Sequence, residues 1–133
     1  MLRPVRRPLV ALLLALAGVS ACGGGASDTE QVHAVVEAFG KASAAKDYQQ
    51  LCDKLLSPKL VKDVESRGLP CEVAVKEGLG DVKAPTLTIG RIAVDGDKAT
   101  AQVQSTAQGE PPSRDTLQLV RAEDGTWRIA SLR

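Results

Sequence analysis

Apolar residues between positions 32 and 42 recur with the spacing of one helix face. They fall at i, i+3, i+4 and i+7 and continue for a further turn: Val32, Val35, Val36, Phe39 and Ala42. This period predicts an amphipathic α-helix that runs to about Lys46. Asp28 or Thr29 is available to cap its N-terminus. No other predicted helix offers so long an apolar stripe.

Three shorter helices are expected after it. The helical spacing repeats over residues 48–55. Ser57 and Pro58 are typical of an N-cap and a first helical position, and the helix that they begin is expected to stop near Gly68. A fourth helix is expected over residues 70–80, where glycines end the pattern.

From Thr86 onward the apolar period changes to two, which is typical of strands with one buried face. Gly90 marks a bulge site, Asp95–Gly96 predicts a tight hairpin, and Gly109–Pro112 predicts a longer turn. Four strands are therefore expected, over Leu87–Val94, Lys98–Thr106, Thr116–Arg121 and Trp127–Leu132. Helices followed by an antiparallel meander indicate an α+β fold in which the long helix covers the sheet.

The beginning of the chain has the layout of an export signal. Three arginines precede an uncharged apolar run over residues 9–19, which is too short to span a bilayer as a stable helix. Val19–Cys22 then resembles a bacterial lipobox: an aliphatic residue and two small residues before a cysteine. We expect cleavage before Cys22 and attachment of acyl chains such as palmitate to that residue. Two chains would anchor the protein durably to the outer face of the bacterial cytoplasmic membrane.

Two alternatives stay open for this segment. It could be an ordinary secretory signal with an incidental cysteine, and Arg6–Arg7 also fits twin-arginine export, although the usual flanking residues are absent. The lipoprotein interpretation divides the chain into a signal peptide (1–21), a lipidated cysteine with a flexible tether (22–28) and one domain (29–133).

Charge and composition exclude several classes of function. The 133 residues carry 17 Lys and Arg against 16 Asp and Glu, and loss of residues 1–21 leaves 14 against 16, a net charge of −2. Such a balance gives no basic footprint for nucleic acid. Three aromatic residues are too few for base-stacking platforms, and a single histidine, His33, cannot build a multi-histidine metal site. No cofactor or metal is expected.

Two cysteines remain in the expected mature domain besides the lipidated one. An even pair, Cys52 and Cys71, in an exported domain predicts a disulfide. A reactive or metal-binding pair is the alternative, but the chain has no CxxC spacing and no further ligand set to support it.

The order of these parts resembles a known family. The long helix ends in Ala-Lys-Asp-Tyr at 45–48, Leu-Cys-Asp follows at 51–53, and a second cysteine lies in a short helix. Val-Asp-Gly-Asp-Lys-Ala-Thr-Ala at 94–101 and a closing Trp-Arg-Ile at 127–129 complete the pattern. Together they look like the NTF2-like superfamily, in the small lipoproteins of actinobacteria, over residues 29–132. The resemblance implies a cone: a curved sheet wrapped around the long helix, with a cavity at the open end.

Fold alone does not decide function in this superfamily, which includes both enzymes and non-catalytic domains. No catalytic set can be placed in the chain, so we expect a non-enzymatic envelope domain that binds a small apolar ligand or an envelope protein. Tyr48, Trp127 and Phe39 are the candidate cavity-lining residues. An isomerase-like or polyketide-cyclase-like enzyme with a cavity acid–base pair is the alternative. Pairing of two copies through the sheet is a further option.

The lipobox generates the first prediction. We expect Cys22→Ser to leave an unlipidated, uncleaved precursor, because the thiol is the acyl acceptor and lipidation precedes cleavage. Labelling with radioactive fatty acid, followed by immunoprecipitation, measures this. Absence of label on the wild-type protein would show that the cysteine is incidental.

Overall fold

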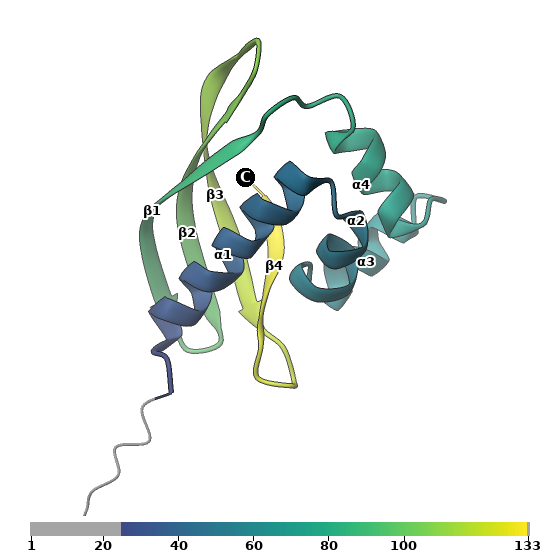
Figure 1. The fold of residues 1–133 in the computed structure, drawn as a ribbon. Coiled ribbons are helices and arrows are strands. Elements are labelled where there is room, and N and C mark those ends of the chain that lie inside the picture. The colour runs from purple at the N-terminus through teal and green to yellow at the C-terminus, as the bar shows by residue number, and fades with distance from the viewer. Residues whose placement is uncertain (1–24, 133) are drawn as a thin grey trace, which may run out of the picture.

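The computed structural model describes residues 25–132, so the signal peptide and Cys22 lie outside the described part. Helices come first and strands second: α1 (Asp28–Ala45), α2 (Tyr48–Gln50), the π-helical turn η1 (Leu51–Leu55), α3 (Pro58–Glu65), α4 (Cys71–Leu79), β1 (Thr86–Asp95), β2 (Lys98–Ala107), β3 (Glu110–Arg121) and β4 (Trp127–Leu132). Figure 1 shows α1 lying along the sheet with the shorter helices grouped beside its C-terminal half. Within residues 25–132, no helix is long and apolar enough to cross a membrane.

The N-cap of the long helix lies one residue before the positions expected to cap it. Ser27 is the N-cap: its hydroxyl accepts from the Glu30 N–H, and the Glu30 carboxylate accepts from the Ser27 N–H in return. This reciprocal pair satisfies two amide groups that the first turn leaves free. The expectation that Asp28 or Thr29 would be the cap is therefore wrong, because a serine three residues before a glutamate completes a capping box. Lys46, at φ 54°, ends the helix in the left-handed conformation.

The short helices are joined to the edge of the sheet. Ser57 caps α3 and Pro58 takes its first position, as the sequence predicts. The Ser57 N–H also donates to the Ile129 carbonyl at 2.8 Å, and Leu56 forms a parallel bridge with Ile129. The two residues between η1 and α3 thus pair with β4 before α3 begins.

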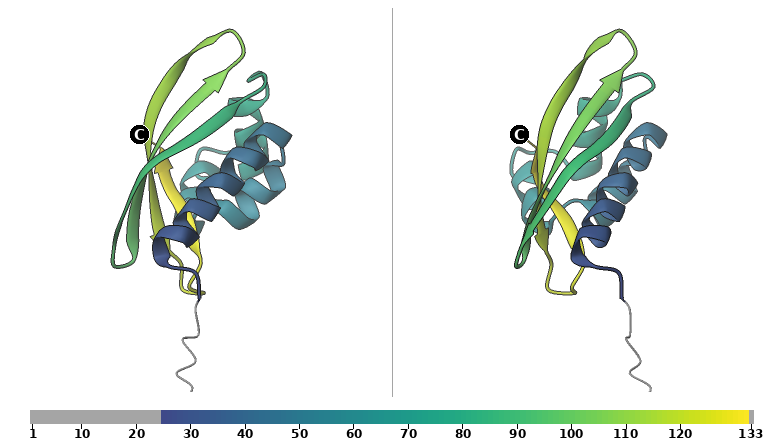
Figure 2. Two further views of the ribbon diagram at one scale, coloured as in Figure 1. Left: turned by 60° about the vertical axis from the view of Figure 1, so that its left-hand side comes forward. Right: turned by 90° about the vertical axis from the view of Figure 1, so that its left-hand side faces the viewer.

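The sheet is a simple antiparallel meander in the order β1-β2-β3-β4. The register between β1 and β2 shifts between Ile89 and Ile92, around the expected bulge at Gly90. Every second residue along a strand faces the helices, and on β2 the buried residues of this row are Ala99, Ala101 and Val103. The strands are strongly twisted (Figure 2), and the helices cover one face of the sheet.

The third strand is longer than the sequence predicts. Glu110–Pro112 belong to β3, and not to a long turn, so the hairpin is a tight one centred on Gln108 and Gly109. The register between β2 and β3 shifts between Ser105 and Ala107, which places the two prolines in an irregular stretch. This part of β3 has no β4 partner, because β4 pairs only from Leu117 onward. Prolines are tolerated at such edges and bulges, where a missing N–H breaks no ladder.

The core lies between α1 and the inner face of the sheet. Val32 and Val36 of α1 are fully buried and share a cluster with buried residues of β2, β3 and β4: Ala99, Ala101, Val103, Leu117, Leu119, Trp127 and Ile129. At the N-terminal end of α1, Arg121 of β3 pairs with Asp28 at 2.7 Å and with Asp97 at 3.2 Å. Its guanidinium also lies 4.7 Å from the centre of the Trp127 ring. One arginine therefore joins helix, hairpin and core at this end.

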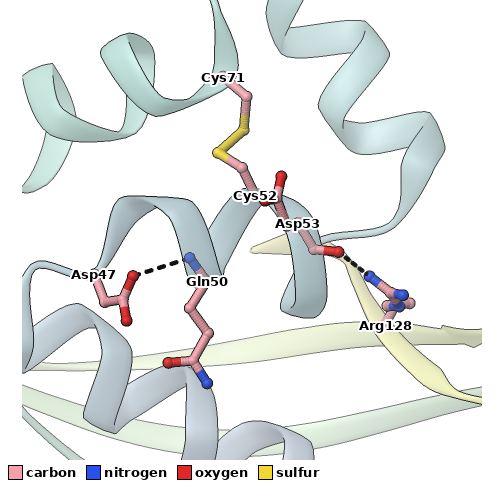
Figure 3. The surroundings of a disulfide bond; sticks show 6 residues. All are labelled: Asp47, Gln50, Cys52, Asp53, Cys71 and Arg128. Carbon is pink, nitrogen blue, oxygen red and sulfur yellow. Dashed lines mark hydrogen bonds between the residues drawn. A yellow bond between two sulfur atoms is a disulfide. The ribbon is translucent and has the colours of Figure 1, made fainter.

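Cys52 and Cys71 form the disulfide that the sequence predicts. The bond joins η1 to the first turn of α4, and both cysteines are buried (Figure 3). Close by, Asp47 accepts from the Gln50 N–H at 3.0 Å and so caps α2, while Arg128 of β4 donates to the Asp53 carbonyl at 2.9 Å. The helical group is thereby tied both to itself and to the sheet.

The second prediction concerns this crosslink. We expect the paired change Cys52→Ala and Cys71→Ala to lower the free energy of unfolding by about 3 kcal/mol, because the bond closes a loop of about 20 residues in the unfolded chain. Urea unfolding of oxidised and reduced protein measures the effect. Reduction of the wild type should reproduce the variant, and a stability unchanged by either treatment would contradict the assignment.

Candidate functional site

A cavity of about 280 Å³ lies between the C-terminal half of α1, the segment that links α4 to β1, and the adjoining ends of β2 and β3. Most of its lining is apolar: Phe39, Leu79, Val82, Leu87, Val103 and Leu117 are among its wall residues. Gly40 also lines it, and a Cβ there would approach the Leu87 Cβ to 3.2 Å, so the glycine lets α1 come close to β1. A mainly apolar lining of this kind is typical of small-molecule pockets.

One wall of the cavity carries a hydrogen-bonded trio: Ser105, Ser113 and Asp115. Ser105 of β2 and Ser113 of β3 are register partners, and their Oγ atoms lie 2.7 Å apart. The Ser113 hydroxyl donates to Asp115 Oδ2 at 3.0 Å. All three residues line the cavity, and they follow the apolar inward rows of their strands at alternate positions. The trio is therefore a polar end to an apolar face.

Asp115 and the trio were missed by sequence reasoning. The sequence pattern predicts a turn that ends at Pro112 and a strand that starts at Thr116, so it assigns Asp115 to neither. The available signal was alternation: Ser113, Asp115, Leu117 and Leu119 are every second residue and share one face of β3. Continuing that row past the prolines would have placed an acid in the cavity.

The three aromatic candidates do not gather in one place. Phe39 lines the cavity. Tyr48 is half-buried and packs against the smaller cluster of Ala42, Leu51 and Leu55. Trp127 is only 2% exposed and belongs to the main core. Neither Tyr48 nor Trp127 is among the lining residues of this cavity, because each packs in another part of the core.

His33 lies on the outside of α1, with its side chain 53% exposed. Its Nδ1 is 3.9 Å from Glu37, whose other oxygen is 2.6 Å from Lys41 Nζ. The Lys41 hydrogen bond and charge lower the pKa of the Glu37 carboxyl. This is a solvated helix surface and not part of the cavity. In the part of the chain that the structure describes, no group of three metal-ligating side chains comes together.

The outer face of the sheet is the other large exposed feature. It is hollowed along β1, β2 and β3, with Thr88, Gln102, Gln104 and Thr116 among the side chains that line the hollow. The helices leave this face open (Figure 2). In the homodimer considered from the sequence, two copies of the chain would pair through this face.

Comparison with solved structures identifies the architecture. An NTF2-like protein of unknown function from Shewanella baltica superposes with a TM-score of 0.57 at 19% identity, covering 81% of this chain and 94% of that one. An NTF2-like family protein from Streptomyces avermitilis, described as a candidate dehydratase, superposes with a TM-score of 0.56 at 22% identity, covering 79% and 92%. The domain has the NTF2-like fold. The α+β cone that the sequence predicts is thereby confirmed.

A designed protein with the NTF2 fold matches as well, with a TM-score of 0.54 at 19% identity, covering 79% of this chain and 85% of that one. No protein-family model and no curated protein matches the sequence. At these identities the likeness establishes the fold, and the chemistry of the cavity must be argued from its own residues.

Ser43 gives the third prediction. It lines the cavity from α1, but its Oγ is buried and has no hydrogen-bond partner among the described residues. Because an unsatisfied hydroxyl and a helical serine both cost stability, we expect Ser43→Ala to raise the free energy of unfolding by about 1 kcal/mol. Ser131→Ala is the matched control: it also removes a buried, unpartnered hydroxyl, but from a strand, without the gain in helix propensity. Urea unfolding of both variants measures this. A loss of stability in Ser43→Ala would show that the hydroxyl is bonded in solution.

Proposed function

We propose that this protein is a lipid-anchored cell-envelope domain that binds a small, largely apolar ligand in the cavity of its cone, without catalysis. The observation that carries the proposal is the cavity itself: an apolar pocket with one polar wall. Pockets with mainly hydrophobic lining and a few placed polar groups are the usual form of small-molecule sites.

The composition of the cavity supports a binding role over a catalytic one. Its ionisable lining residues are two carboxyl groups, Asp115 and Glu110, and the lining includes no histidine, tyrosine, lysine or cysteine. General acid–base chemistry needs a proton donor and an acceptor held on either side of the reacting group. Two acids on one strand, with only hydroxyls and apolar groups opposite, supply no such arrangement.

The anchor is supported by the sequence. Cys22 comes after two small residues and before three glycines, and α1 begins only six residues later. A chain of that length extends at most about 22 Å. Lipid on Cys22 would therefore hold the domain close to the outer face of the cytoplasmic membrane.

An enzyme of isomerase or cyclase type is the second candidate, and Asp115 is the observation that favours it. Among the structural neighbours, one from Shewanella frigidimarina is described as a candidate ketosteroid isomerase and superposes with a TM-score of 0.53 at 21% identity. A carboxylate in a cavity of this kind could act as a base. Turnover of a ketosteroid by the wild type, lost in Asp115→Asn, would favour this candidate over the binding role.

An envelope protein is the other occupant that the cone mouth could accept, and the open outer sheet face could pair two copies of the chain. These readings differ in what accompanies the purified protein. A ligand gives a fixed added mass on the monomer, a second copy doubles the mass, and a partner protein adds a chain of its own.

The fourth prediction separates these outcomes. We expect native mass spectrometry of protein purified from its own envelope to show one reproducible small added mass. Ala107→Phe should remove it, because Ala107 lines the cavity and a phenyl ring would fill it. Ala93→Phe is the control, since Ala93 is exposed on β1 and does not line the cavity. An empty wild-type protein, with no small mass and no co-purifying chain, would overturn the proposal.

A further inference from the structure

The hydroxyl protons of the trio are already used within it. An ionised carboxylate only accepts, so Ser113 must donate its one proton to Asp115. The 2.7 Å contact between Ser113 and Ser105 then takes its proton from Ser105. Both serine hydroxyl protons are therefore engaged in hydrogen bonds within the trio. Toward a ligand the trio can act only as an acceptor, through serine lone pairs and the carboxylate oxygens.

The charge of the cavity has a single sign. Asp115 and Glu110 line it, and no lysine, arginine or histidine does. Arg114, the neighbour of Asp115, lines the outer hollow, because successive residues of a strand face opposite sides. Lys46, at the end of α1, directs its Nζ to the Gly80 carbonyl. Neither of these two cations lines the cavity, and Lys83, in the segment that links α4 to β1, does not line it either.

Two free hydroxyl donors stand against these acceptors, and the first is Ser43, which lines the cavity and has no hydrogen-bond partner among the described residues. Thr86 and Thr106 line the cavity with their hydroxyls hydrogen-bonded to each other, which uses one proton and leaves one. Two neutral hydroxyls give an anionic ligand little compensation for the two carboxylates. A buried anion would face both desolvation and like-charge repulsion.

We infer that the cavity selects a small apolar molecule with one hydrogen-bond donor group, and that it prefers a protonated amine to an anion of the same size. The apolar walls take the hydrocarbon part, and Asp115 with Ser105 accepts from the ammonium. This inference rests on the proposed ligand-binding function and adds the chemical class of the ligand.

The test uses three probes with one hydrocarbon chain and different heads: hexylamine, hexanol and hexanoate. The full-length protein is held in neutral phosphatidylcholine nanodiscs, with empty nanodiscs as the reference, and binding is measured by ligand-observed NMR near neutral pH. At that pH an alkylamine carries its proton and a carboxylic acid has lost its own. We expect hexylamine to bind about tenfold more tightly than hexanoate, with hexanol between them.

Variants assign the preference to its residue. Asp115→Asn should reduce the amine-to-carboxylate ratio by about tenfold, since it removes the charge and keeps the shape. Glu123→Gln is the control, because it makes the same change of net charge in an exposed turn outside the cavity. Asp115→Glu keeps the charge and should keep the preference, which covers the case that the amide variant folds poorly.

The outcomes separate the two proposals. If none of the three probes binds to the wild type, ligand binding in this cavity fails as a function. If hexanoate binds as tightly as hexylamine, or if Asp115→Asn leaves the amine-to-carboxylate ratio unchanged, the cavity binds ligands but does not select for a donor group. The inference about ligand class is then wrong, and the proposed binding function stands.

Discussion

The structure depends on how one helix packs on the sheet. The helix α1 covers the inner face, but it is shorter than the longest strands. The 18 residues of α1 span about 27 Å. The 12 residues of β3 span about 40 Å. Val32 and Val36 close the core at one end, where the helix and all four strands overlap. At the other end β2 and β3 run on beyond the cover, and the cavity forms in the space between them and the last turns of α1.

The residues along each strand follow this change of cover. On β2 the inward row is buried through Ala99, Ala101 and Val103 and then becomes half-buried at Ser105. On β3 the buried Leu117 gives way to Asp115 and Ser113. Polar groups are expensive inside a packed core but not at its margin, where they can bond to each other and remain accessible. The polar wall of the cavity is therefore placed where the helix stops covering the sheet.

Sequence patterns predicted the fold well and the site poorly, for a common reason. Strong periodicity identified the helices, the meander and the fold class, because most residues in those segments face a continuous core. The prolines at 111 and 112 break the pattern, so the predicted third strand begins at Thr116, too late in the chain to include Asp115. Aromatic side chains were then taken as the markers of a cavity, although the hydrophobic effect draws large rings such as Trp127 into the filled core. In a sequence, the signal of such a cavity is the point where small or polar residues replace large apolar ones along the inward face of a strand. The largest apolar residues instead mark the filled core.

The two ends of the cone also differ in how firmly they are held. At the end where α1 begins, Arg121 joins the helix to the β1–β2 hairpin and to Trp127, so that three elements share one cation. The cavity lies at the other end, beside the last turns of α1 and the hairpin of β2 and β3 (Figure 1). Phe39 lies 11 residues after Asp28, or about 16 Å along the helix. The proposed anchor at Cys22 would be attached through its tether next to the charged, closed end, at the opposite end of α1 from the cavity.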